Sequence, residues 1–208
     1  MRSLVLFACV LFLCGCVSKE QAQPAAEIPT KVIFSDDFSS GNMSGWRFQT
    51  TGGGAISAQD HPTFKVKSAA EMTSSGFRSA VAQAPHFTMD WGGDYDVSFN
   101  FMLLHRDNFG YTVYQDRNVY LSLDQATGIS CVQPTKRRFL GRFDTNVWSR
   151  ILVKVRPQEG EYDVSLNDEP KGTCDIMKSD TQTFLLGDSD PTDVIYGDGL
   201  WDDFKITE

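Results

Sequence analysis

Five residues in the middle of the chain carry side chains suited to binding a sugar. They are Asn100, Tyr114, Tyr120, Arg106 and Trp91. Both tyrosines occupy rows opposite the apolar residues of their strands, and Trp91 is the tryptophan expected to be most exposed. An aromatic ring covers the apolar C–H patch of a sugar, while planar amide and guanidinium groups hydrogen-bond its hydroxyls. We therefore expect these residues to line one solvated sheet face that binds glycan.

The same residues also have a purely structural interpretation. Tyrosines are common on sheet surfaces, and the basic cluster Lys136-Arg137-Arg138 is typical of a solvated loop. The cluster also has the charge needed to meet an acidic polysaccharide. No Gly-x-Ser-x-Gly or His-Glu-x-x-His motif is present in the sequence, so a non-catalytic role is favoured.

The elements that must position these side chains have the pattern of β-strands. From Tyr95 onward, apolar and polar residues alternate with a period of two between turn signals. The clearest strands cover residues 95–103, 110–115, 119–123, 151–155, 162–167 and 202–206. The Pro157 to Gly160 turn predicts a hairpin. We expect an all-β fold in which two antiparallel sheets pack as a sandwich.

Composition and charge set the broad class of the protein. The 208 residues are 41% hydrophobic and 22% charged, which suits one globular domain, expected over residues 31–208. The 19 Lys and Arg against 27 Asp and Glu give a formal net charge of −8. A chain with this charge lacks the basic surface that binds a phosphate backbone, so nucleic acid is not an expected partner.

The first thirty residues predict export. An apolar run from Leu4 to Leu13 follows Arg2, and it is well short of the roughly 20 residues that span a bilayer. The run ends in Leu13-Cys14-Gly15-Cys16, which resembles the bacterial lipoprotein box. That resemblance implies a signal peptide over 1–15, a lipid on Cys16 as membrane anchor, and a tether over 16–30. It places the protein outside the cytoplasm, at the outer membrane, periplasm or cell surface. The alternative is an ordinary secretory peptide.

Cysteine usage agrees with an oxidising compartment. After lipidation of Cys16, only Cys131 and Cys174 remain in the expected mature chain. A disulfide between them would close a loop of about 43 residues and stabilise the fold by roughly 4 kcal/mol. Two buried thiols are the alternative.

Three segments together resemble the concanavalin A-like jelly-roll superfamily, in particular its laminin-G-like bacterial members. They are FSDDFSSGNMSGW (34–46), WSRILVKVRPQEGEYDVSLND (148–168) and GLWDDFKI (199–206). The resemblance implies a jelly-roll sandwich whose last strand pairs beside its first. The activities of the superfamily are diverse, so this fold does not by itself decide a function.

The first and last of these segments each contain an Asp-Asp-Phe motif. The four carboxylates are Asp36, Asp37, Asp202 and Asp203. If the terminal strands pair, these carboxylates come close and repel, and calcium is the ion whose oxygen ligands relieve that repulsion. We therefore expect one structural calcium ion as the only cofactor. The alternative is that these carboxylates cap loops in solvent.

Catalysis on this fold is the alternative function. The Glu-x-Asp-x-Glu triplet of family-16 glycoside hydrolases is absent. Jelly-roll alginate lyases use Tyr and His to move a proton, and Arg and Gln to neutralise the uronate carboxylate. A partial resemblance to them implies the candidates His105, Arg106, Tyr111, Tyr114 and Gln115. The favoured function remains a lectin-like lipoprotein that binds glycan or another envelope component, with a protein-interaction module as the third possibility.

Overall fold

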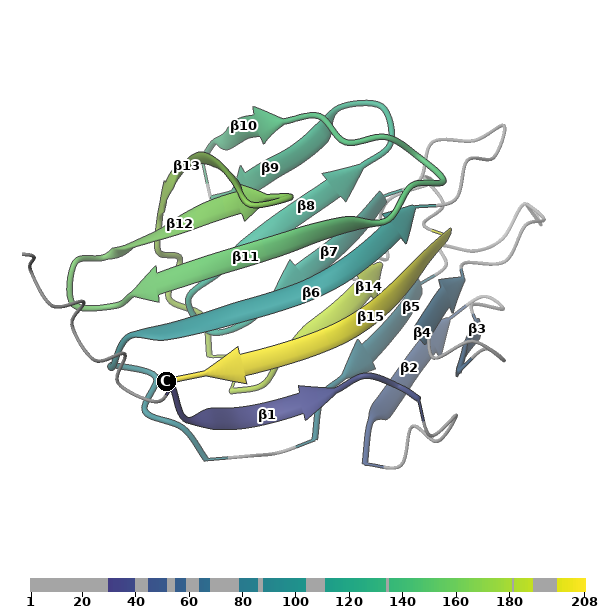
Figure 1. Ribbon diagram of the computed structural model, residues 1–208, viewed down its shortest axis with the longest axis horizontal. Coiled ribbons are helices and arrows are strands. Elements are labelled where there is room, and N and C mark those ends of the chain that lie inside the picture. The colour runs from purple at the N-terminus through teal and green to yellow at the C-terminus, as the bar shows by residue number, and fades with distance from the viewer. Residues whose placement is uncertain are drawn as a thin grey trace, which may run out of the picture.

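The computed structural model describes residues 30–39, 45–51, 55–58, 64–67, 79–85, 88–103, 111–133, 135–180, 182–188 and 198–208. Within these ranges every regular element is a β-strand, and the strands form two antiparallel sheets packed face to face (Figure 1). The prediction of an all-β sandwich is therefore confirmed. Among the same residues, no helix has the length and apolar character needed to cross a membrane.

The first sheet, called the eight-stranded sheet, faces the viewer in Figure 1. Its strand order is β13-β12-β11-β6-β15-β4-β3, with β1 as an additional partner of β15. The strands are β1 (Val32–Asp36), β3 (Ala55–Ala58), β4 (Phe64–Lys67), β6 (Tyr95–Leu103), β11 (Ser149–Arg156), β12 (Glu161–Leu166), β13 (Glu169–Asp175) and β15 (Asp198–Thr207). The β11–β12 pair is the predicted hairpin, and Gly160 in its turn has a φ of 77°.

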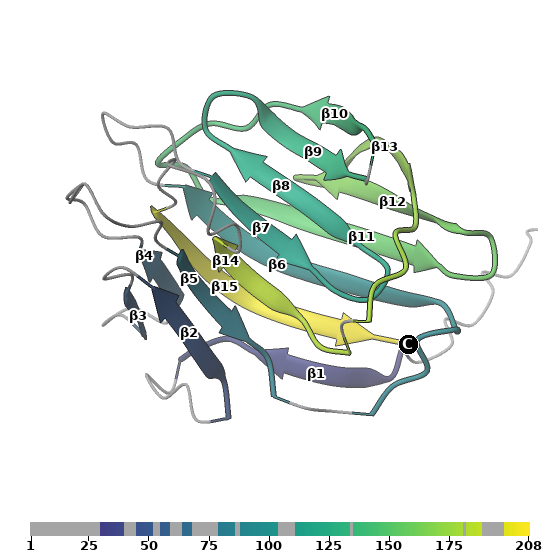
Figure 2. The ribbon, with the colours of Figure 1, turned by 180° about the vertical axis from the view of Figure 1, so that it is seen from behind.

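The second sheet, called the seven-stranded sheet, faces the viewer in Figure 2. Its order is β10-β9-β8-β7-β14-β5-β2. The strands are β2 (Arg47–Thr51), β5 (Ser79–Gln83), β7 (Tyr111–Gln115), β8 (Tyr120–Asp124), β9 (Gly128–Val132), β10 (Arg137–Gly141) and β14 (Leu185–Asp188). All of its pairings are antiparallel.

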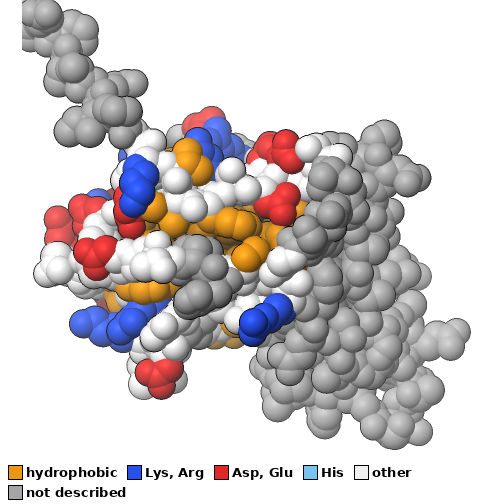
Figure 3. All heavy atoms as spheres, turned by 90° about the horizontal axis from the view of Figure 1, so that it is seen from below, with side chains coloured by type: hydrophobic (Ala, Val, Ile, Leu, Met, Phe, Trp, Pro, Cys, Tyr) orange, Lys and Arg blue, Asp and Glu red, His pale blue; other side chains and the backbone are white. Residues whose placement is uncertain are grey.

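The first and last strands lie side by side, as the resemblance implied. Asp36 of β1 stands opposite Phe204 of β15. Beyond the strands, the N–H of Lys31 donates to the carbonyl of Glu208 at 2.8 Å, and the N–H of Glu208 donates back at 2.9 Å. Figure 3 looks at the molecule from the β1 side and shows a band of hydrophobic side chains bordered by charged ones. Val32 contributes to the exposed apolar surface of β1, with 49% of its surface exposed.

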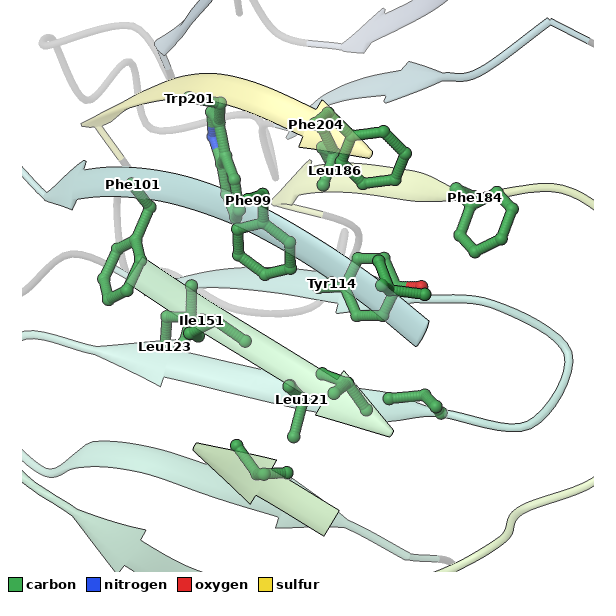
Figure 4. Close-up of a cluster of buried hydrophobic side chains, with 14 of the residues drawn as sticks. Phe99, Phe101, Tyr114, Leu121, Leu123, Ile151, Phe184, Leu186, Trp201 and Phe204 are labelled. Atoms are coloured by element: carbon green, nitrogen blue, oxygen red, sulfur yellow. The ribbon is translucent and has the colours of Figure 1, made fainter. Parts of the chain in front are cut away.

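Aromatic rings from both sheets fill the space between the sheets. In β6, burial alternates at every residue, so one side of the strand is in the core and the other is partly exposed. Figure 4 shows Phe99 of β6 near Tyr114 of β7, and their ring centroids are 5.2 Å apart. The rings of Trp201 and Phe204 of β15 also pack on the Phe99 ring, with centroid distances of 5.3 and 6.2 Å. This apolar layer is the main source of stability in such a sandwich.

A disulfide joins the two sheets at one end of the sandwich. It links Cys131 of β9 to Cys174 of β13, with the two Cα atoms 6.3 Å apart. Both cysteines are buried. The predicted bridge is therefore confirmed.

Candidate functional site

The predicted sugar-binding residues do not share one face. Asn100 lies on β6 in the eight-stranded sheet, whereas Tyr120 begins β8 in the seven-stranded sheet. Their core-side neighbours point toward each other between the sheets, so Asn100 and Tyr120 lie on opposite outer faces. The expectation of a single shared face is wrong. Alternation predicts the buried row of β6 correctly, but it does not say which strands enter which sheet.

Tyr114 is inside the core rather than on a solvated face. None of its surface is exposed, and its hydroxyl donates to Oδ2 of the buried Asp116 at 2.7 Å. Asp116 also accepts hydrogen bonds from the Tyr95 hydroxyl at 3.1 Å and from the backbone N–H groups of Asn118 at 2.6 Å and Val119 at 2.8 Å. The predicted placement of Tyr114 is wrong because a buried carboxylate satisfies its hydroxyl.

The Asp116 network is a structural unit of the β7–β8 turn. Burial raises the pKa of Asp116 to about 6, although four hydrogen bonds favour the ionised form. Burial, together with the charge of Asp116, also raises the pKa of the Tyr114 phenol well above its usual range. A buried phenol of this kind has no access to a polysaccharide, which removes Tyr114 from the lyase candidates. The sequence Asp116-Arg117-Asn118 signalled a turn but not this network.

The tryptophans also differ from expectation. Trp91 is half-buried, because its ring packs on Phe184 at 5.4 Å and on Tyr95 at 5.9 Å. Trp148, by contrast, is 41% exposed. The expectation that Trp91 is the more exposed of the two is therefore wrong.

Several predicted residues lie outside the described ranges. They are Cys16, His105 and Arg106. The structure places Tyr111 on β7 without describing its side chain. Gln115, another lyase candidate, lies on an outer face, since its neighbour Tyr114 points into the core.

Gln115 and Tyr120 belong to a row of side chains that crosses the whole seven-stranded sheet, which we call the polar row. Hydrogen-bonded pairing aligns Arg47 with Gln83, Gln83 with Leu185, Leu185 with Gln115, and Gln115 with Tyr120. The β8–β9 register continues from Tyr120 to Val132, and Val132 pairs with Arg137. Each of these side chains is half-buried or exposed. Figure 2 shows the strands that carry the row, in the order β10-β9-β8-β7-β14-β5-β2.

The polar row lies on the outer face because the residues beside it point into the core. Tyr114, Leu121, Cys131 and Leu186 are all buried members of the core. Seven strands spaced by about 4.8 Å extend the row over roughly 29 Å. Its members supply two amides, a phenol ring and two guanidinium groups. The sequence did not reveal this row because its residues come from seven separate strands.

A second row runs beside the polar row on the same face. It aligns Val113, Ser122, Ser130 and Phe139 across β7 to β10. Ser122 and Ser130 are buried, whereas Phe139 is 55% exposed. The Ser122 hydroxyl has no hydrogen-bond partner in the part of the chain that the structure describes.

A small cavity of about 210 Å³ lies at the β2–β5 end of the polar row, and Arg47 and Gln83 form part of its lining.

The four aspartates expected to bind calcium do lie at one junction of β1 and β15. Desolvation raises the pKa of Asp202, and the charges of Asp203, Asp37 and Asp36 add to the effect. Asp36 already accepts the N–H of Phe38 and the indole N–H of Trp46, each at 2.7 Å.

Asp203 accepts the amide N–H of Asn100 at 2.7 Å, so it too is already engaged. Within the described ranges, no three acidic, histidine or cysteine side chains are grouped as metal ligands. Asp36 in particular fits a structural role better than a metal-binding one. The calcium ion stays a prediction.

Comparisons with known proteins show the fold. No protein-family model matches the chain, and no curated protein sequence matches it. Among solved structures, a sialidase aligns over 85% of this chain with a TM-score of 0.62 and 9% identity. The alignment covers 18% of the sialidase, so this chain corresponds to less than a fifth of that protein.

Two similar structures match over almost their whole length. The Emp47p carbohydrate recognition domain aligns over 86% of this chain and 97% of its own, with a TM-score of 0.54 and 10% identity. The cellulose-induced protein Cip1 aligns over 83% and 96%, with a TM-score of 0.58 and 14% identity. At these identities the similarity establishes a shared β-sandwich and leaves function to the residues of this chain.

Proposed function

We propose that the protein binds a glycan chain on the outer face of its seven-stranded sheet, along the polar row. The observation that carries the proposal is the alignment of Gln83, Gln115 and Tyr120 in one row of partly exposed side chains. A row of roughly 29 Å suits an extended polymer better than a single sugar ring.

The side chains of the row supply the groups that sugar recognition requires. Tyr120 offers a ring against which the C–H face of a sugar packs. Gln83 and Gln115 each offer an amide, which donates and accepts hydrogen bonds at the short spacing of neighbouring hydroxyls. Arg47 and Arg137 stand at the two ends and add further donors. Leu185 and Val132 supply apolar contact between the polar groups.

The comparisons support the proposal at the level of the fold. One similar structure is described as a carbohydrate recognition domain, and another is described as a cellulose-induced protein. Their sandwiches align with most of this chain, so a glycan-binding role is consistent with the scaffold. A lyase is not proposed, because Tyr114 is buried and its hydroxyl is bonded to Asp116.

We also propose that Cys16 carries the lipid expected from the sequence and anchors the domain outside the cytoplasm. The support is the Leu13-Cys14-Gly15-Cys16 motif after an apolar run. Mass spectrometry of the protein purified from bacterial membranes tests this point. Acyl chains on Cys16, and their loss together with membrane association in Cys16→Ala, are expected. An unmodified Cys16 in membrane fractions would refute it.

Affinity electrophoresis through gels containing neutral or acidic polysaccharides tests glycan binding. At least one polysaccharide should retard the wild type. Tyr120→Ala should weaken binding about tenfold, since stacking on an aromatic ring contributes about 1.4 kcal/mol. Tyr120→Phe keeps the ring and should retain most of the affinity. Gln115→Ala should weaken binding, whereas the control Gln158→Ala, in the exposed β11–β12 turn, should not.

Two outcomes would overturn the proposal. One is a wild-type protein that migrates equally in every gel. The other is a Tyr120→Ala protein that binds as tightly as the wild type, because the polar row would then not be the contact surface.

A further inference from the structure

A β-bulge in β15 hollows the outer face of the opposite, eight-stranded sheet. Asp202 pairs with Asn100 and Lys205 pairs with Ser98, so Asp203 and Phe204 together stand opposite the single residue Phe99. Asp203 has a φ of 48°, in the left-handed region that Asp tolerates better than most residues. Phe204 is buried, and Asp203 is left on the outside of the sheet.

The hollow beside the bulge is a cavity of about 530 Å³, which we call the bulge groove. It crosses four neighbouring strands in the order β11-β6-β15-β1, a span of roughly 14 Å at the usual strand spacing. The polar residues that line it include Arg150, Ser98, Asn100, Asp203, Lys205 and Asp37. Phe99 and Phe204, both almost fully buried, also line it. A cavity of this volume is within the range of small-molecule sites.

Hydrogen bonds hold the centre of the groove in place. The Asn100 amide N–H donates to Oδ2 of Asp203 at 2.7 Å, which fixes the orientation of the amide. The amide oxygen of Asn100 therefore points away from Asp203, where it can accept a ligand donor. Arg150 reaches the groove from β11, with 55% of its side chain exposed and its guanidinium 4.0 Å from Asp168.

The charges of the groove select against simple ions. Asp36, Asp37 and Asp203 oppose an anion, while Arg150 and Lys205 oppose a cation. A neutral molecule with several hydroxyl groups meets neither repulsion. Its hydroxyls donate to the carboxylates and the Asn100 oxygen, and they accept from the guanidinium, the ammonium and the serines. The chemistry that fits is a neutral sugar ring.

We propose that the bulge groove is a second saccharide site, which binds a neutral sugar ring independently of the polar row. The two sites are on the outer faces of different sheets, so they share no residue. The ligand of the bulge groove is a single sugar ring, whereas the proposed ligand of the polar row is an extended glycan chain.

Amide NMR spectra of the full chain, titrated with methyl glycosides of glucose, galactose and mannose, test this site. At least one of these sugars should produce saturable shifts at residues 98–100 and 203–205. Asn100→Ala should weaken that binding at least tenfold. Arg150→Gln is the second variant, because it changes an exposed side chain and a loss of binding would then not result from misfolding. This variant should also weaken binding. Tyr120→Ala, on the opposite face, should leave these shifts unchanged.

The outcomes separate this site from the polar row. Shifts confined to the seven-stranded sheet would overturn the second site and leave the proposed glycan-binding face intact. Saturable shifts at residues 203–205 with calcium chloride, and none with the sugars, would overturn it in favour of a cation site. Equal affinities of the wild type, Asn100→Ala and Arg150→Gln would also overturn it.

Discussion

Replacing Asp116 with Asn should remove a pH dependence of stability that originates in the core. Burial raises the pKa of Asp116 to about 6 in the folded protein, against an ordinary value of 3.8 for an exposed Asp. The folded state therefore binds a proton that the unfolded state releases between these two values. Linkage makes the free energy of unfolding fall as the pH rises through this window, by about 3 kcal/mol in total.

Urea unfolding of both proteins at pH 4, 5, 6 and 7 measures this effect. The stability of the wild type minus that of Asp116→Asn should fall by about 2.4 kcal/mol from pH 4 to pH 7, because the other titrating groups cancel. The Asn side chain keeps an oxygen to accept the N–H groups of residues 118 and 119. A difference that stays constant from pH 4 to pH 7 would refute the reasoning.

A companion variant tests the cause of the shift. The Tyr114 hydroxyl lowers the pKa of Asp116 through its hydrogen bond. Tyr114→Phe deletes that hydroxyl, so the upper end of the window should move to higher pH. A window that moves to lower pH, or stays in place, would show that the phenol does not stabilise the carboxylate.

Three further changes probe the scaffold. Cys131→Ser should lower the free energy of unfolding by about 4 kcal/mol in urea, since the bridge closes a 43-residue loop. Asp36→Ala should destabilise by about 1–3 kcal/mol and change tryptophan fluorescence, because Trp46 loses its indole hydrogen bond. Gly128→Ala should lower the Tm more than Gly160→Ala: both have positive φ, but only at Gly128 would a Cβ collide with backbone.

Alternation predicted the strands well but not always the face that each row occupies. In β6, the predicted apolar row is the buried one at all five positions. In β7, Val113 and Tyr114 are neighbours, both are buried, and apolar character does not distinguish the inner row. Which of the two side chains points into the core depends on Asp116, because Asp116 binds the Tyr114 hydroxyl. Asp116 is buried only because β6 packs against β7. Polar partners in the core are therefore the main reason for the error.

The candidate sites depend on pairings between distant parts of the chain. Asn100 and the Asp202-Asp203 pair were both singled out from the sequence, but for different chemistries. Only the register of β6 against β15 brings Asn100 and Asp203 within hydrogen-bond distance. The polar row likewise requires seven strands in register. A one-residue slip in any of them would turn its side chain to the other face, so sequence patterns alone do not reveal the row.

The pairing of β1 with β15 determines how the domain responds to mechanical load. The Lys31–Glu208 pair is at the start of β1, where the preceding chain enters the sandwich. A pull on that chain, against a ligand held on a sheet face, loads the β1–β15 hydrogen bonds one after another. Strands whose hydrogen bonds break one at a time separate at low force, so β1 should detach first. Phe34 would then leave the rings of Trp46 and Phe204, which lie 5.9 and 6.1 Å away.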